Sequence, residues 1–315
     1  MKADHVLLVG FGAPEKVEDV RAFLAKVAEG RAIPEERLSE VEHHYAVIGG
    51  SPYNRHALEF KRHLEEDLRE RGLTLPVYLG MRNWHPFMGN TLTEIASKGH
   101  CAGIGVILSV QRSISSCARY KDDVAQAKKS AGAEGVDYAF LPPWYDHPYF
   151  IEAQTDLIRK LLGEKKQTVE ETHFLFTVHS IPVDMAKACD LCDYREEFNE
   201  TARLTAERLG APSWSQAYQS RSGSPRQPWL EPDILDEIKR LVSEGKRKIV
   251  VVPAGFLFDN AEVLFDLDVE AGDLARSLGI GYHRAPTVMG HPLMRKLFAD
   301  LIQKTAASDK QFLQR

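Results

Sequence analysis

A histidine that ends an apolar run is the first side chain placed for chemistry. The run Phe174–Val178 stops at His179, and Pro182 keeps the chain from continuing as a central strand. An imidazole at such a position can accept or hold a proton near neutral pH, or it can simply cap the strand through a backbone hydrogen bond. On this feature alone the two interpretations carry equal weight.

A row of acidic residues follows a second apolar run, "VVVPAGFLF". Glu262, Asp266 and Glu270 are spaced i, i+4 and i+8, so a helix would place them on one face. No lysine or arginine occurs between residues 248 and 276 to offset their charge. The row is either a solvated acidic face or a cation site that begins at the edge of a sheet.

The two features together favour one site more than either does alone. An imidazole and a carboxylate at the ends of two strands would form an open N/O site. Such a site suits a divalent first-row metal in transit, or proton transfer. A closed structural zinc site would require four ligands, with cysteines among them.

The elements that position these side chains alternate along the chain, which predicts βαβ units. We expect an α/β fold with two doubly wound, Rossmann-like lobes, each a four-stranded parallel sheet flanked by helices, with a cleft between them. The lobes are predicted at 1–150 and at 151–315, and the second lobe carries His179 and Glu262. Whether the last helix packs back across the lobes is left open. Predicted strands cover 5–12, 76–82, 103–110, 137–144, 173–180, 213–220, 248–256 and 280–287, and clear helical patterns cover 15–30, 55–72, 146–166 and 194–210.

Composition excludes several classes of function. The 315 residues carry a formal charge of -5, and a general affinity for nucleic acid would need a basic face. No apolar segment approaches the roughly 20 residues that span a bilayer, and the start of the chain does not read as a signal peptide. We expect a cytoplasmic protein without a transmembrane segment, and a monomer is favoured.

The cysteines are Cys101, Cys117, Cys189 and Cys192. Disulfides are not expected in a cytosolic chain of this size. Cys189 and Cys192 form a C-x-x-C pair, which is only half of a metal or cluster site. Reduced thiols are therefore favoured over a cluster.

Four segments, in order along the chain, carry a resemblance to a known family. "YAVIGGSPYN", "VHSIP", "YQSRSGSPRQPWLEPD" and "PAGFLFDNAEVLFDLDVE" resemble motifs of the ferrochelatases, lyases that insert ferrous iron into a porphyrin in haem biosynthesis. "SRSGSPRQPWLEP" and "SSCARY" are most similar to the enzymes of Gram-positive bacteria that act on coproporphyrin III. The resemblance implies a metal chelatase for coproporphyrin III. Protoporphyrin IX as the substrate, a non-catalytic tetrapyrrole carrier and a metal-dependent hydrolase are the alternatives.

The resemblance also implies roles for individual residues. His179 falls on the histidine that contacts the metal and accepts the pyrrole protons, and Glu262 falls on the facing acidic ligand. Asp266 and Glu270 continue the acidic face along which iron approaches. The implied porphyrin-binding residues all lie in the lobe at 1–150, which would form the porphyrin-binding wall and lip: Ser51, Tyr120, Tyr45, Arg31 and Phe11.

Two further consequences concern an additional iron ligand and cofactors. Phe11 takes a position that is tyrosine in some relatives, so no oxygen ligand is expected on the opposite face of the macrocycle. No cofactor is required, since Fe(II) is a substrate. A [2Fe-2S] cluster on Cys117, Cys189 and Cys192 is a minority alternative, because the tail that supplies ligands in some relatives has no cysteine here.

Overall fold

The computed structural model describes residues 2–29, 34–189, 192–222 and 226–308. Two compact units are present, each with its own parallel sheet and covering helices. Unit 1 comprises residues 1–109, 116–142 and 294–315, and unit 2 comprises residues 110–115 and 143–293. The predicted α/β class with two four-stranded parallel sheets is confirmed.

The sheet of unit 1 has the strand order β2-β1-β3-β4. The inner strand β1 is buried along its whole length, as expected for a parallel strand covered on both faces. Val9 is in register with Gly80 on one side and Ile107 on the other. The strands are β1 (His5–Gly10), β2 (Val77–Met81), β3 (Ala102–Ile107) and β4 (Asp137–Phe140).

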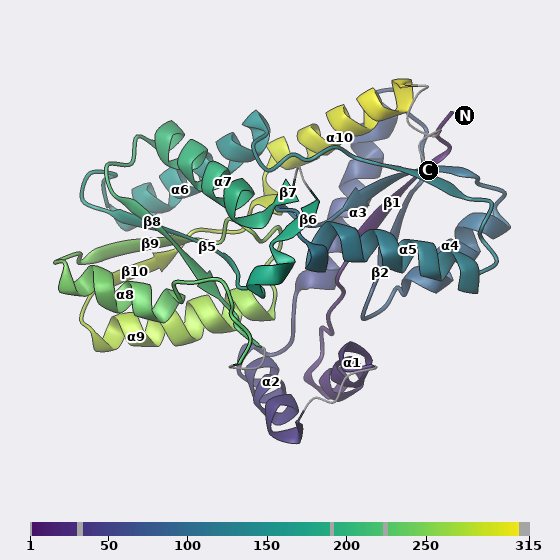
Figure 1. Ribbon diagram of the computed structural model, residues 1–315. Helices are drawn as coiled ribbons and strands as arrows, with labels where there is room; N and C mark the ends of the chain where they lie inside the picture. Colours follow the sequence, from purple (N-terminus) through teal and green to yellow (C-terminus); the bar gives the residue numbers. More distant parts are fainter. Residues whose placement is uncertain (1, 30–33, 190–191, 223–225, 309–315) are drawn as a thin grey trace. The chain divides into compact units, whose positions relative to one another are not determined.

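Helices cover both faces of this sheet, with α4 and α5 on one side and α3 and α10 on the other (Figure 1). Helix α10 packs on α3 through Phe298, whose ring centroid lies 5.4 Å from that of Phe60. Arg295 and Asp67 add an ion pair at 3.5 Å. The helices of unit 1 are α1 (Val20–Val27), α2 (Glu35–Ile48), α3 (Tyr53–Glu70), α4 (Met88–Ser97), α5 (Arg119–Ser130) and α10 (Pro292–Ala307).

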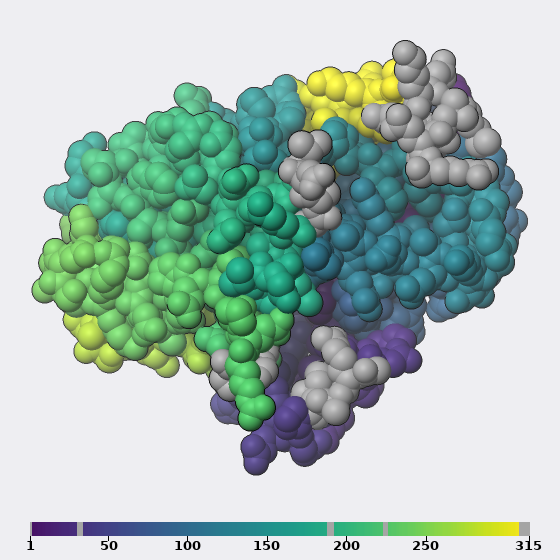
Figure 2. Space-filling model, viewed as in Figure 1, coloured from purple at the N-terminus to yellow at the C-terminus, as the bar shows by residue number. Residues whose placement is uncertain are grey.

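The sheet of unit 2 has the strand order β10-β9-β5-β8. Helices α6 and α7 bury one face and α8 and α9 the other (Figure 1). In the space-filling view, the surface of unit 2 is coloured from teal through green to yellow-green, the colours of the second half of the chain (Figure 2). The elements are β5 (His173–His179), β8 (Trp214–Gln219), β9 (Lys248–Val252), β10 (Gly281–Arg284), α6 (Pro148–Lys165), α7 (Tyr194–Leu209), α8 (Ile234–Ser243) and α9 (Ala271–Ser277).

Several short elements lie between these strands and helices. The strands β6 (Lys187–Cys189) and β7 (Cys192–Asp193) pair antiparallel. Among the described residues, two segments are π-helices, η2 (Ile114–Ala118) and η4 (Val263–Glu270). The 3-10 turns are η1 (Val17–Asp19), η3 (Val183–Met185) and η5 (Val288–Gly290). No helix in the described ranges is both long and apolar enough to cross a membrane.

Local signals explain where α7 begins and ends. The Asp193 carboxylate accepts the amide N–H groups of Arg195 and Glu196, which satisfies donors that the first turn leaves unpaired. Gly210 follows with a φ of 74°, a conformation that glycine adopts without steric cost. The predicted helix over 194–210 is confirmed. The predicted helix over 15–30 is divided into η1 and α1, and its expected end at Gly30 lies outside the described residues.

A buried histidine at the start of β5 makes stability depend on pH. His173 is 4% exposed, and its ring nitrogens bond to the hydroxyls of Ser213 and Ser215 at 2.8 and 2.9 Å. Burial, assisted by the nearby Lys246 charge, lowers the pKa of His173 to about 4. The folded state therefore binds fewer protons than the unfolded state between pH 6.5 and 4, so stability is lost as the pH falls through that window.

We expect His173→Gln to remove this part of the acid sensitivity. Between pH 7 and pH 4 the parent protein should lose about 3 kcal/mol more unfolding free energy than the variant, because the glutamine does not titrate. Urea unfolding of both proteins at the two pH values measures the difference. Equal losses in the two proteins would show that His173 is protonated without cost in the fold.

Candidate functional site

Parallel pairing brings the two predicted groups to one edge of the sheet in unit 2. Strands β5 and β9 are neighbours and run parallel, with Phe176 in register with Val252. His179 is the last residue of β5, and Glu262 follows the turn after β9. Ligands in open α/β sheets bind at this carboxyl edge, so the topology of unit 2 supports the predicted pairing.

His179 is half-buried, and its Nδ1 lies 2.5 Å from the carbonyl oxygen of Ser180. A carbonyl can only accept, so Nδ1 carries the proton and Nε2 is the basic nitrogen of the neutral ring. The Tyr194 hydroxyl donates to the His179 carbonyl at 3.0 Å. Burial raises the pKa of Tyr194, so this hydroxyl stays a donor. The contacts hold the ring with one defined nitrogen available for proton transfer.

Glu262 immediately precedes a π-helix, which contains Asp266 and Glu270 in place of the α-helix implied by the i, i+4, i+8 argument. The amide of Ala271 bonds to the carbonyl of Asp266, five residues earlier. At the start of the segment, the Asn260 side chain accepts the Val263 amide N–H at 2.9 Å. π-helical turns are rare and frequent at functional sites, because the wider turn changes where side chains point. Sequence spacing alone does not distinguish the two helix types.

Exposure increases along the acidic row. Glu262 and Asp266 are half-buried and Glu270 is exposed, whereas Val263 and Leu267 between them are buried. The hydroxyl of Ser220 donates to the Asp266 carboxylate. The arrangement is a row of carboxylates that runs from solvent towards Glu262.

Part of the nearby acidic charge is neutralised from another strand. Arg284 at the end of β10 pairs with Asp268 at 2.7 Å and with Asp259 at 3.2 Å. The negative charge of segment 248–276 is therefore smaller than its own residues suggest, because a basic residue outside the segment neutralises part of it. Long-range pairing of this kind cannot be read from neighbouring residues.

Gln219 is a residue of this site that the sequence analysis missed. It is fully buried at the end of β8, in register with His179. Its side-chain nitrogen donates to the Glu262 carbonyl at 2.9 Å, and its side-chain oxygen has no hydrogen-bond partner in the described part of the chain. Gln219 thus ties the start of the acidic helix to the strand beside His179. The only signal in the sequence is a polar residue at the last position of a predicted strand.

In unit 1, Phe11 directly follows β1 and so lies at the carboxyl edge of that sheet. Its amide donates to the Tyr53 hydroxyl at 3.2 Å. The rings of Phe11 and Tyr45 both contact Phe23, with centroid distances of 6.3 and 5.9 Å. Two of the residues assigned to porphyrin by resemblance therefore share one aromatic cluster.

The loop that precedes Ser51 depends on Gly50. Ser51 is 1% exposed, and its amide donates to the Pro14 carbonyl at 2.9 Å. A Cβ on Gly50 would lie 1.9 Å from the carbonyl oxygen of Glu15, and the φ of 99° is one that residues with side chains rarely adopt. Close approach of two backbone segments holds Ser51 at this position.

Gly50→Ala is expected to destabilise the protein clearly more than Gly49→Ala. Both glycines have positive φ, but nothing lies within 4 Å of a Cβ on Gly49. The Gly49 change should cost about 1–2 kcal/mol for the left-handed conformation alone, and the clash at Gly50 should add about 1–3 kcal/mol. Urea unfolding of the two variants provides the comparison, and equal costs would contradict the close approach.

Tyr120 and Arg31 complete the predicted porphyrin set. Tyr120 is 7% exposed and packs in the core of unit 1 with residues such as Val9 and Met88. Arg31 lies outside the described residues. The porphyrin contacts of all five residues stay predictions from the resemblance.

The cysteines differ from expectation at one position. Cys192 is disulfide-bonded, so the prediction of reduced thiols is wrong there. The backbones of Cys189 and Cys192 lie opposite each other in the β6-β7 pair, a local antiparallel pairing that composition does not reveal. The side chain of Cys189 lies outside the description, and Cys101 and Cys117 are thiols. In its disulfide form Cys192 has no thiolate to offer a cluster.

Solved structures show which fold this is. The sirohydrochlorin chelatase SirB from Bacillus subtilis subspecies spizizenii, in complex with cobalt, superposes with a TM-score of 0.59 at 13% identity over 99% of both chains. SirB from Bacillus subtilis with Fe3+ gives a TM-score of 0.61 at 13% identity over 99% of both chains. At this identity the likeness establishes a shared fold.

Sequence comparison is more specific. The chain is 38% identical to a ferrochelatase of Rhodopirellula baltica, over 96% of this chain and 86% of that protein. It is 37% identical to the coproporphyrin III ferrochelatase of Mycolicibacterium smegmatis, over 96% of this chain and 90% of that protein. The family model described as Ferrochelatase matches residues 3–306. The chain therefore belongs to the ferrochelatase family.

Proposed function

We propose that this protein is a lyase of haem biosynthesis that inserts Fe(II) into coproporphyrin III. Family membership supports a chelatase for iron and a porphyrin. Relatives from Mycolicibacterium smegmatis and Streptomyces griseus, both 37% identical, are named coproporphyrin III ferrochelatases. The Rhodopirellula baltica relative is named only as a ferrochelatase, so the choice of porphyrin is the part that most needs a test.

The observation that carries the proposal is the defined tautomer of His179. Its Nδ1 is engaged by the Ser180 carbonyl, which leaves Nε2 as a proton acceptor at the carboxyl edge of the sheet. Metallation of a porphyrin by Fe(II) forms iron–nitrogen bonds and releases two pyrrole protons. His179 Nε2 accepts these protons, one after another, and passes them to solvent.

Glu262 is the oxygen ligand that holds Fe(II) beside the porphyrin until the pyrrole nitrogens bind the iron. Carboxylate and imidazole ligands both suit a divalent first-row metal. Asp266 and Glu270 extend the ligands outward, in order of rising exposure, so iron reaches Glu262 along this row. Gln219 keeps the start of the row in place through the Glu262 carbonyl.

The porphyrin contacts proposed for unit 1 are those implied by the family, at Ser51 and Tyr120 with Tyr45, Arg31 and Phe11. Phe11 has no oxygen to offer, so this position provides no axial ligand to iron. Binding energy from the edge of the macrocycle is available to bend the ring, which turns the pyrrole lone pairs towards the metal.

The test is an anaerobic absorbance assay with coproporphyrin III and protoporphyrin IX in parallel, each with Fe(II). We expect the free-porphyrin bands to disappear with coproporphyrin III at least roughly tenfold faster, a difference of about 1.4 kcal/mol. Faster turnover of protoporphyrin IX would overturn the choice of substrate. Binding of either porphyrin without consumption of Fe(II) would identify a carrier and overturn the enzymatic proposal.

A further inference from the structure

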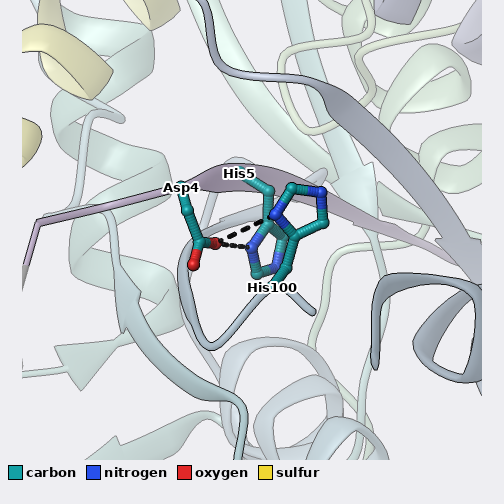
Figure 3. A group of neighbouring side chains, drawn as sticks. All are labelled: Asp4, His5 and His100. Carbon is teal, nitrogen blue, oxygen red and sulfur yellow. Dashed lines mark hydrogen bonds and ion pairs between the residues drawn. The ribbon is translucent and has the colours of Figure 1, made fainter. Parts of the chain in front are cut away.

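Three potential metal ligands converge at the amino end of the sheet in unit 1. Asp4 and His5 lie at the start of β1, and His100 lies just before β3. One carboxylate oxygen of Asp4 and one ring nitrogen of each histidine all lie within 4.8 Å of one another. Figure 3 shows the Asp4 carboxylate directed at both imidazole rings. This is the opposite end of β1 from Phe11, about 20 Å away at the usual rise of a strand.

The distances suit a cation after a small movement. Asp4 Oδ1 lies 3.6 Å from His100 Nδ1 and 2.6 Å from His5 Nδ1. In a tetrahedral zinc site with bonds of 2.0–2.2 Å, ligand atoms lie about 3.4 Å apart. The His100 separation already matches. The shorter contact is a hydrogen bond whose proton a metal would replace, and opening it requires a shift of about 1 Å at the half-exposed Asp4.

The second carboxylate oxygen of Asp4 and the second ring nitrogen of His5, which would not bind the metal, already make hydrogen bonds. Asp4 Oδ2 accepts the amide N–H groups of Cys101 and Ala102 at 2.8 and 3.2 Å, which leaves Oδ1 facing the histidines. His5 Nε2 lies 2.9 Å from the Tyr138 hydroxyl. A metal-bound histidine usually engages its other nitrogen in this way, and such partners set the orientation and basicity of the ligand.

Access to the group is one-sided. The His5 side chain is fully buried, whereas those of His100 and Asp4 are 20% and 31% exposed. The ring of Tyr78 packs edge-on against both imidazoles, with centroid distances of 5.8 Å. The nearby ammonium of Lys98, 5.2 Å from the centre of the Tyr78 ring, is paired with Glu94 at 2.7 Å. A cation would enter past Asp4 and His100 and meet a rigid ligand at His5.

We propose that Asp4, His5 and His100 form a binding site for a divalent first-row cation of the zinc or cobalt type, separate from the His179 site. Two imidazoles and one carboxylate are the ligand set that such ions favour, and a fourth position stays open to solvent. The proposal rests only on the geometry of unit 1 and not on the proposed reaction.

The experiment measures Zn2+ binding by equilibrium dialysis of the full chain after treatment with a chelator. His100→Ala removes a ligand that is partly exposed, and His56→Ala is the matched control on α3 of the same unit. We expect His100→Ala to weaken binding at one site by roughly a hundredfold, whereas His56→Ala binds as the parent does. The His179→Ala variant should still bind Zn2+ at this site. Its Zn2+ binding therefore distinguishes a failure of this proposal from a failure of the proposed reaction.

Two further readouts guard against a folding defect. Without metal, His100→Ala should melt within a few degrees of the parent, and only the parent and His56→Ala should melt higher with Zn2+. Tyr138→Phe, which leaves all three ligands in place, should weaken binding by about 10–100-fold, and Co2+ should give a visible d–d band that His100→Ala lacks. Equal Zn2+ stoichiometry and affinity in the parent and His100→Ala would overturn the proposal and leave a hydrogen-bonded pair at the start of a strand.

Discussion

Replacing His179 with alanine is expected to lower the rate of iron insertion by roughly 10²–10⁴-fold while porphyrin binding stays nearly unchanged. The factor is that of a positioned general base, because two pyrrole protons must leave for each iron that enters. The hydrogen bond from Nδ1 to the Ser180 carbonyl fixes which nitrogen performs this role. Alanine removes the acceptor but does not alter β5, whose hydrogen bonds are made by the backbone.

Single-turnover absorbance with Fe(II) measures the rate, and quenching of porphyrin fluorescence measures binding. His283→Ala is the matched control, since His283 is a partly exposed histidine on β10, the edge strand of the same sheet. It should retain the parental rate. A rate for His179→Ala within about threefold of the parent would exclude His179 as the proton acceptor.

Glu262→Gln is expected to reduce insertion at low Fe(II) by roughly 10²–10³-fold. The change keeps the shape of the side chain and the bond from Gln219 to the Glu262 backbone carbonyl, so the loss reports on the charge alone. A neutral amide is a poor ligand for a hard divalent ion, so the effect should be largest when iron is scarce.

The assay varies Fe(II) at saturating porphyrin and compares kcat/KM for iron. Asp273→Asn serves as the control, because Asp273 is exposed on the following helix α9 and is paired with Arg276. Its kcat/KM should stay at the parental value. Equal losses in the two variants would mean that general acidic charge, and not a ligand at Glu262, attracts the metal.

Much of the fold could be predicted, because the inner strands β1, β3, β5 and β9 are apolar runs and several helices carry regular apolar stripes. The run Phe174–Val178 indicated a buried strand, and Gly210 stops α7 in a left-handed conformation that glycine adopts without steric cost. The position of the candidate site could also be predicted from the sequence. Parallel strands place their carboxyl ends at one edge of the sheet, where His179 ends β5 and Glu262 lies beyond the end of β9.

Other features could not be predicted from residue types and spacing. The pairing of Arg284 with Asp259 and Asp268 reduces a charge that looked unopposed. The disulfide at Cys192 contradicts an expectation drawn from compartment alone. The π-helix at Val263–Glu270 uses the same spacing of acidic residues as an α-helix would, so only its hydrogen bonds reveal it.

The amino-acid sequence by itself determined the α/β class, the strand that ends at His179 and the family, because apolar periodicity and short motifs are local properties. Only the tertiary structure decided that Nδ1 of His179 is engaged, that Gln219 supports Glu262, and that Asp4, His5 and His100 meet at the far end of β1. Each of these depends on where a side chain points in the folded chain. That direction is set by how the backbone turns and packs, even between neighbours such as His179 and Ser180, and spacing along the sequence carries no record of it.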